Sequence, residues 1–188
     1  MSKIFYTSDL HFGHKAIMRY DDRPFTSVEE MDETIIKNWN NTVSAVDTVY
    51  VLGDISWYKA DKTIDIFKRL NGHKILIKGN HDKFSYENYK TMGFEQVCDY
   101  KEIKDRGRNV VLCHYPIPCF NKRFYGAYML YGHVHNSFEW NYMKSLRRDF
   151  EAIDTRCNIF NVGTMCWDYT PVTLDKIIEN DEFYKSAA

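Results

Sequence analysis

The sequence predicts an α/β fold of mixed order, and three features indicate it. Short runs rich in β-branched and aromatic residues recur along the chain, and each ends at Gly, Asp, Asn or His. Stretches with apolar residues at helical spacing lie between the early runs. The later runs follow one another as β pattern.

The first half of the chain predicts alternating strands and helices. Ser27 and Glu30 form the capping-box pattern that starts a helix, and apolar residues at helical spacing follow them. Asn71-Gly72 and Gly93 predict where two later helices end. The expected strands are 3–8, 48–52 and 74–78, and the expected helices are 14–20, 28–43, 60–70 and 85–92.

The second half predicts mainly strands. A turn over residues 105 to 108 separates the first two, and a short helix is expected after Pro171 and Thr173. The expected strands are 96–104, 109–113, 127–131 and 158–162. Because no repeat, low-complexity segment or linker divides the sequence, we expect one domain over residues 1–188.

The composition favours a globular protein without strong attraction to polyanions. A chain of 188 residues buries roughly 70% of its unfolded surface. With 25 basic and 26 acidic residues the net charge is −1, so we expect no extended nucleic-acid binding. The densest basic cluster, Lys144, Arg147 and Arg148, is typical of solvated surface.

The N-terminus and the cysteines indicate a cytoplasmic protein. No apolar stretch approaches the length of a membrane span, and the N-terminus does not resemble a signal peptide. The five cysteines are an odd number without a C-x-x-C pair, which argues against a disulfide framework and against a thiolate zinc site. We therefore expect reduced thiols and no membrane partner.

Polar side chains follow five of the expected strands, at the point where each strand ends. In an open α/β sheet the loops after the strands meet at one edge, where ligands bind. Six of the seven histidines lie in or beside these loops, and the seventh, His73, is expected to be an exposed loop residue. The candidate metal ligands are Asp9, His11, Asp54, Asn80, His114, His133 and His135.

This set of side chains predicts a two-metal site. Carboxylate, amide and imidazole ligands without thiolate suit Mn²⁺, the first expectation, as well as iron, Zn²⁺ or Ni²⁺. Seven ligands are too many for one tetrahedral ion but suit two ions that share a carboxylate. Two ions about 3.5–4 Å apart activate a bridging hydroxide for in-line attack on a phosphate ester. His133 and His135 stand two apart, and an extended backbone would point both rings to the same side, one toward each ion.

The motifs SDLH, GD, GNHD, a lone His after a strand, and GHVH, in this order, resemble the calcineurin-like metallophosphoesterase family. They lie within residues 4 to 135, and NVG followed by W-x-x-x-P-V resembles the C-terminal end of small prokaryotic and phage members. The resemblance implies a four-layer sandwich, in which two mixed β-sheets pack face to face between helices. Residues 1–188 would form one such domain.

The resemblance also implies a role for each motif residue. One ion would be held by Asp9, His11, Asp54 and His135. The other would be held by Asp54, Asn80, His114 and His133. Asp54 would bridge the two ions, and His81 would act at the leaving oxygen as general acid or as charge stabiliser.

Four other residues lie in or beside these motifs, and two of them, His14 and Arg23, each have two interpretations. His14 either reaches the substrate phosphate or a ligand's surroundings, or is the polar first turn of the helix 14–20. Arg23 either clamps a phosphate or pairs with Asp21 or Asp22 in a loop. Asp82 is expected to fix the GNHD loop, and Cys113 to face the core.

The function predicted is hydrolysis of phosphate esters, with phosphodiesters such as cyclic or small nucleotides favoured, by direct attack of a metal-bridging hydroxide. The alternatives are a nuclease or a phosphomonoesterase of the same family, and a metal-binding scaffold without physiological catalysis. The complete ligand set and His81 argue against the scaffold. A metallo-β-lactamase-type hydrolase is excluded, because Asn136 and Ser137 follow HVH where H-x-H-x-D-H is required.

Overall fold

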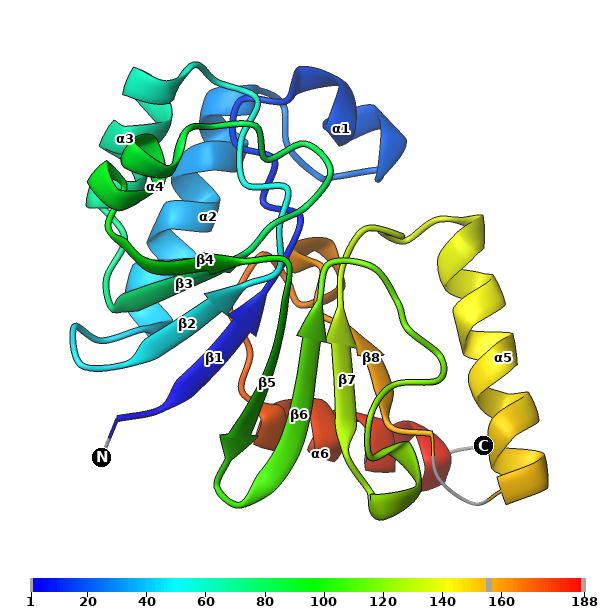
Figure 1. The fold of residues 1–188 in the computed structure, drawn as a ribbon. Coiled ribbons are helices and arrows are strands. Elements are labelled where there is room, and N and C mark those ends of the chain that lie inside the picture. Colours follow the sequence, from blue (N-terminus) through cyan, green and yellow to red (C-terminus); the bar gives the residue numbers. More distant parts are fainter. Residues whose placement is uncertain (1, 155–156, 187–188) are drawn as a thin grey trace.

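The computed structural model describes residues 2–154 and 157–186, whose strands form two four-stranded sheets (Figure 1). The first sheet is parallel and has the order β1 (Ile4–Thr7), β2 (Thr48–Val51), β3 (His73–Ile77) and β4 (Phe94–Cys98). In the second sheet β5 (Tyr100–Asp105) pairs antiparallel with β6 (Arg108–Cys113), and β7 (Tyr128–Tyr131) and β8 (Ile159–Asn161) continue in parallel. The expected α/β sandwich is confirmed, although the first sheet is parallel where the resemblance implied a mixed one.

Helices cover the outer face of each sheet. The first sheet packs against α1 (Lys15–Tyr20), α2 (Val28–Thr42), α3 (Ala60–Lys68) and α4 (Tyr86–Thr91). In this order the helices contribute Ile17, Met31, Phe67 and Tyr89 to one core cluster. On the second sheet, α5 (Phe138–Asp154) packs through Met143 against Met129 and Ile159. Two 3₁₀ turns, Arg123–Tyr125 and Thr164–Cys166, and the helix α6 (Leu174–Ser186) complete the elements.

The inner faces of the two sheets share one core. Side chains alternate along a strand, so Phe5 of β1 faces the helices and Tyr6 faces the second sheet. Tyr6, Tyr50 and Ile77 of the first sheet are buried in the same cluster as Leu112 and Leu130 of the second. Leu174 and Ile177 of α6 belong to this cluster as well.

Two features of the second half differ from the sequence-based expectation. The expected strand 96–104 is two strands, because β4 pairs with β3 and β5 pairs with β6, and the chain passes from one sheet to the other between them. The helix α5 was not predicted. Its apolar residues Trp140, Met143, Leu146 and Phe150 do follow helical spacing, but charged and polar residues surround them.

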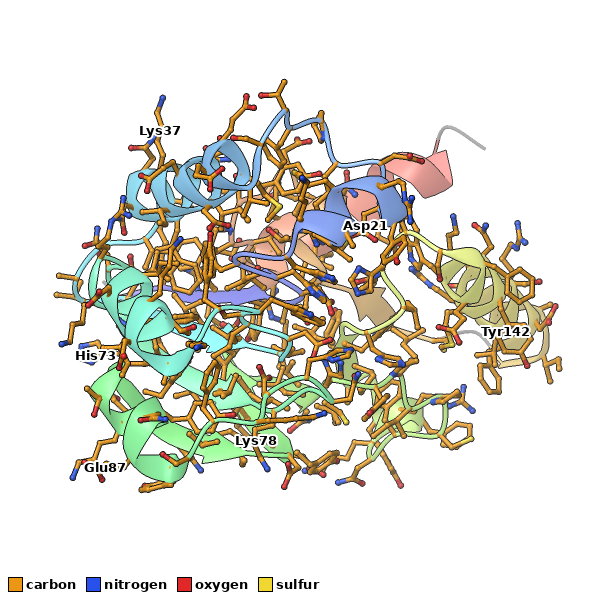
Figure 2. All side chains as sticks on the ribbon, turned by 90° about the horizontal axis from the view of Figure 1, so that it is seen from above. Asp21, Lys37, His73, Lys78, Glu87 and Tyr142 are labelled. Carbon is orange, nitrogen blue, oxygen red and sulfur yellow. The ribbon has the colours of Figure 1, made fainter. Side chains whose placement is uncertain are left out.

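Charged side chains project from the outer surface of the sandwich. Seen from above, Lys37 and Glu87 project outward, and His73 lies at the edge, whereas Asp21 lies nearer the middle (Figure 2). His73 is exposed as expected, but it is the first residue of β3 and its ring lies 2.5 Å from Glu95. Lys144 and Arg148 are exposed as expected, but the side chain of Arg147 is only 14% exposed and pairs with Asp181 and Glu151. The thiol of Cys113 packs against the core beneath α5, as expected. Within residues 2–154 and 157–186, no helix has both the length and the apolar character needed to cross a membrane.

Candidate metal centre

The loops that follow β1, β2, β3, β6 and β7 bring the seven predicted ligands together. Asp9 and His11 follow β1, Asp54 follows β2, and Asn80 follows β3. The remaining three come from the second sheet, with His114 directly after β6 and His133 and His135 after β7. The ends of strands from both sheets therefore build one site.

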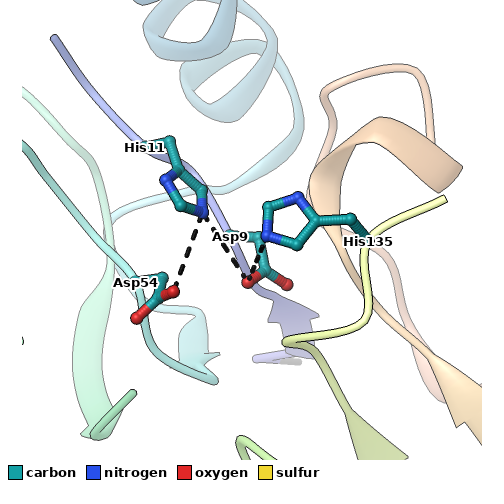
Figure 3. Close-up of side chains that lie close together, drawn as sticks. All are labelled: Asp9, His11, Asp54 and His135. Atoms are coloured by element: carbon teal, nitrogen blue, oxygen red, sulfur yellow. Dashed lines mark ion pairs between the residues drawn. The ribbon is translucent and has the colours of Figure 1, made fainter. Parts of the chain in front are cut away.

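The first half of this site consists of Asp9, His11, Asp54 and His135 (Figure 3). Each offers one ligand atom, and these atoms all lie within 4.8 Å of one another. The Nε2 atom of His11 lies 3.9 Å from Asp9 Oδ1 and 3.8 Å from Asp54 Oδ2, and His135 Nε2 lies 3.6 Å from Asp9 Oδ1. Asp9, His11 and Asp54 are buried, and His135 is partly buried.

These separations fit ligands around an ion better than they fit hydrogen bonds. A hydrogen bond between such atoms spans roughly 2.7–3.2 Å. Two ligand atoms that each lie about 2.1 Å from one ion are separated by about 3–4 Å. The Nε2 atom of His11 is buried and has no hydrogen-bond partner, which a bound cation at this point would supply.

The second half consists of Asp54, Asn80, His114 and His133. His114 Nε2 and His133 Nδ1 each lie 3.0 Å from Asn80 Oδ1, and His114 Nε2 lies 3.8 Å from Asp54 Oδ2. The other ring nitrogen of His114, Nδ1, donates to the carbonyl oxygen of Leu52 at 2.7 Å. In the neutral ring Nε2 then carries a lone pair, so it meets the oxygens of Asn80 and Asp54 as a third acceptor. Acceptors that converge in this way fit a cation between them.

Asp54 belongs to both halves. Its Oδ2 atom lies 3.8 Å from His11 Nε2 and 3.8 Å from His114 Nε2. Its Oδ1 atom accepts the backbone N–H of His81 at 3.0 Å. Asp82 accepts the backbone N–H groups of Asp54, Ile55 and Gly79, as expected for a residue that fixes the GNHD loop.

Burial sets the protonation of the buried ligands. It raises the pKa of Asp9, which the neighbouring histidines His135 and His114 oppose. It lowers the pKa of His11 well below the usual value, and it also lowers the pKa of His133. Both rings are therefore neutral near pH 7, which is the form of imidazole that binds metals.

The candidate ligands have an unusual backbone conformation. Asp9, His11, Asp54, His133 and His135 all have positive φ, between 51° and 69°. Such left-handed residues cost about 1–3 kcal/mol each and gather at functional sites, although Asp and His tolerate them better than most. The idea that an extended backbone aligns His133 and His135 is wrong, because β7 ends at Tyr131 and both residues turn. The ring of His135 nevertheless lies in the first half of the site, and the ring of His133 lies in the second.

Two glycines let the loops approach each other at this site. A Cβ atom on Gly132 would collide with the hydroxyl of Ser8 and lie 2.5 Å from Asp9 Oδ2. A Cβ atom on Gly53 would lie 2.6 Å from His114 Nδ1, and Gly53 has a φ of +88°. Both positions therefore require glycine.

Comparison with known proteins identifies the family. The family model for calcineurin-like phosphoesterases matches residues 2–167. The chain belongs to the calcineurin-like phosphoesterase family. An uncharacterized protein of Methanocaldococcus jannaschii is 36% identical over 181 residues, covering 95% of this chain and 91% of that protein. The gene 66 protein of Mycobacterium phage L5 is 32% identical over 164 residues, covering 72% of this chain and 79% of the phage protein.

A solved structure shares this fold over almost the whole length of the chain. The crystal structure of a protein of unknown function from Aquifex aeolicus, AQ665, superposes with a TM-score of 0.73. It is 28% identical and covers 95% of this chain and 99% of its own. This calcineurin-like phosphoesterase is thus a hydrolase by family, with a candidate metal-binding cluster at the ends of its strands.

Asp21 contacts the candidate metal centre, which the sequence did not predict. It is buried at the C-terminal end of α1, and its Oδ2 atom accepts the Nδ1–H of His135 at 2.9 Å. The hydrogen bond to Asp21 and the charge of Asp9 outweigh burial and raise the pKa of His135. A carboxylate behind a histidine fixes the ring and leaves Nε2 free for a metal. The sequence indicated Asp21 only as a possible ion-pair partner of Arg23.

Arg23 does not have the exposed position that a phosphate clamp requires. Its guanidinium is fully buried and bonds to Asp21 at 2.9 and 3.0 Å and to the carbonyl oxygens of Asp9 and Leu10. Of the two readings for Arg23, the ion pair with Asp21 is the one that forms. The substrate-binding reading is corrected, because every face of the guanidinium is covered by protein.

His14, Trp57 and His81 lie together at the entrance to the site. The Nδ1 atom of His14 lies 3.2 Å from Nδ1 of His11, so His14 lies beside a candidate ligand and also at the start of α1. His81 is exposed, and its ring centre lies 6.4 Å from that of His11. Trp57 contacts both His14 and His81 and was not singled out by the sequence. Exposed Tyr115 lies against His133, a candidate ligand of the second half.

Proposed function

We propose that this phosphoesterase hydrolyses phosphodiesters, with cyclic or small nucleotides as the preferred class, at a centre of two divalent ions. The observation that supports it most is the convergence of acceptor atoms on two points that share Asp54 Oδ2. Asp9, His11 and His135 complete one set of ligands, and Asn80, His114 and His133 complete the other. Mn²⁺ is the proposed metal, because oxygen and imidazole ligands without thiolate suit it.

His81 and His14 have proposed roles beside those of the ions. Bound ions would supply a water of lowered pKa and neutralise charge on the phosphoryl oxygens. His81 stands exposed beside the ligands, where its imidazole donates a proton to the departing oxygen. His14 lies beside His11, within reach of a phosphate oxygen that enters from the solvent side.

The openness of the site favours diesters. Asn80, His81, Trp57 and Tyr115 are all exposed around the buried carboxylates. A phosphodiester carries a substituent on each side of the phosphorus, and an open edge gives room to both. Exposed aromatic rings beside a ligand of each half, Trp57 against His11 and Tyr115 against His133, also suit the flat base of a nucleotide.

The test is hydrolysis of a panel of esters by the purified protein. The panel holds phosphomonoesters, linear diesters, 2′,3′- and 3′,5′-cyclic nucleotides and short nucleic acids, each with Mn²⁺, Ni²⁺ or Zn²⁺ and with a chelator. We expect Mn²⁺-dependent hydrolysis of diesters that the chelator abolishes. Preference for monoesters would overturn the diester assignment, and preference for nucleic acids would replace the small-nucleotide class by a nuclease. No hydrolysis of any ester would favour the scaffold.

The matched variant is Asp54→Asn. The amide keeps the shape of the side chain but loses the charge that both halves share, so we expect metal content to fall. Turnover should fall by about 100-fold or more, since metal charge stabilisation is worth several kcal/mol. Metal analysis and kinetics on the same sample check both effects. A variant that keeps two ions and full turnover would contradict the bridging role.

A further inference from the structure

Trp57 contacts three imidazoles at the edge of the site. Its indole stacks on His14 with ring centres 3.9 Å apart and an interplanar angle of 2°. It also stacks on the ligand His11 at 4.7 Å and lies 4.3 Å from His81 at 46°. Trp57 is nevertheless 38% exposed, so one part of the indole packs on buried His11 while another part faces solvent.

The ring of His81 has no polar anchor among the described residues. Its backbone N–H bonds to Asp54, but no hydrogen bond or ion pair reaches the imidazole within residues 2–154 and 157–186. The candidate ligands differ in this respect, since the ring of His135 is held by Asp21 and that of His114 by the carbonyl oxygen of Leu52. An imidazole that transfers a proton in a defined direction needs some group to orient it. Within the described part of the chain, the His81 ring has two aromatic neighbours. The indole of Trp57 at 4.3 Å is nearer than the ring of His11 at 6.4 Å, so the indole is the contact that restricts the ring of His81 most.

The backbone that carries Trp57 is itself fixed. Its N–H donates to the carbonyl oxygen of Phe12 at 2.8 Å, and Phe12 forms a parallel bridge with Ser56. The hydroxyl of Ser56 contacts that of Thr63 at 2.8 Å, which ties the loop to α3. The indole therefore lies on a loop that is hydrogen-bonded on two sides.

We propose that Trp57 is a positioning residue for His81: the indole holds the imidazole in the orientation from which it protonates the leaving oxygen. This inference rests on the proposed function, because it assigns a partner to His81 within the same reaction. Misplacement of a reacting group by about 1 Å costs on the order of 100-fold in rate. Loss of the indole should therefore lower turnover without removing the metals.

The experiment compares Trp57→Ala, Trp57→Phe, His81→Gln and the double variant Trp57→Ala/His81→Gln on two diesters. One diester has an alkoxide leaving group of high pKa, and the other has a nitrophenolate that needs no proton. We expect Trp57→Ala to lower kcat on the alkoxide diester by about 10–100-fold and on the nitrophenyl ester by less than about threefold. Trp57→Phe should restore most of the loss, and the double variant should be no slower than His81→Gln alone.

Two controls keep the result interpretable. Metal content of each variant is measured, because Trp57 also touches His11. Tyr125→Ala removes an aromatic ring that is 86% exposed and lies in the 3₁₀ turn Arg123–Tyr125, so it should leave both rates unchanged. An equal loss on both diesters, or a double variant slower than His81→Gln, would overturn the positioning role.

A second readout does not depend on turnover. In the metal-free protein the indole shifts the NMR signal of the His81 ring proton on Cε1 through its ring current, and His81→Gln identifies that signal. We expect the signal to move toward the position of free histidine in Trp57→Ala. An unmoved signal would overturn the inference alone, whereas a wild-type protein inactive on every ester would overturn the proposed function and leave this contact to be judged by NMR.

Discussion

His135 and His114 show how single residues prepare the site. Each ring uses Nδ1 for a protein acceptor, the carboxylate of Asp21 or the carbonyl oxygen of Leu52, and presents Nε2 to the site. Asp54 divides its two oxygens in the same way, with Oδ1 on a backbone N–H. The lone pairs that face the centre are therefore aimed before any ion arrives, which lowers the ordering cost of binding one.

Arg23→Gln tests whether the arginine acts inside the protein or on the substrate. The change leaves Asp21 buried without its cation, and removal of one partner from a buried ion pair costs about 3–5 kcal/mol. We therefore expect urea denaturation to show a loss of that size, with KM for a diester unchanged. Arg19→Gln on the exposed face of α1 is the control and should stay within about 0.5 kcal/mol. An unchanged stability with a raised KM would restore the phosphate-clamp reading.

The site residues that could be predicted from the sequence differ from the others in what places them at the site. The seven candidate ligands stand directly after strands, so a correct strand pattern brings them to one edge without any knowledge of packing. Asp21 and Trp57 act through contacts between loops far apart in the sequence, and neither belongs to a repeated pattern. The buried position of Arg23 also depends on how α1 folds over Asp9, which no local motif encodes.

At the scale of elements, the sequence predicted the ends of a strand or helix correctly where those ends depend on neighbouring residues in the chain. Ser27 caps α2 as predicted, with its hydroxyl accepting the N–H of Glu30 at 3.1 Å. The return bond differs from the predicted box, because Glu30 accepts from the N–H and hydroxyl of Thr26, one residue earlier. The division of residues 94–105 into β4 and β5 could not be read locally, since it depends on which sheet each half joins.

Ser27→Ala measures what this cap contributes. The N–H of Glu30 loses its acceptor while the helix keeps its buried face, Met31, Ile35 and Trp39. Loss of such a cap costs about 1 kcal/mol, so we expect the free energy of unfolding in urea to fall by that amount. Ser27→Asp keeps an acceptor at the same position and should stay close to wild type. Equal losses in both variants would show that the serine acts through something other than the cap.

At the scale of the whole molecule, the candidate centre joins the two sheets. Asp9, His11, Asp54 and Asn80 come from loops of the first sheet, and His114, His133 and His135 come from the second. Away from this edge, the hydroxyl of Tyr6 in β1 donates to buried Asp105 at the end of β5. The sandwich is thus held by its shared core, by this hydrogen bond and, when ions bind, by ligands from both sides.

Metal binding should therefore stabilise the whole fold and not one loop. An ion that binds the folded chain alone adds about 2.7 kcal/mol when its free concentration is 100 times Kd. For a chain of this size, that gain raises Tm by roughly 5–10 °C. We expect a calorimetric titration with Mn²⁺ to show this rise in a single transition, and a chelator to reverse it.

Ca²⁺ at the same concentration is the control ion, because it prefers sites built only from oxygen ligands. Asp54→Asn should lose most of the Mn²⁺ response, since its carboxylate faces ligands from both sheets. A Tm that stays constant while metal analysis finds two bound ions would contradict the coupling between the sheets.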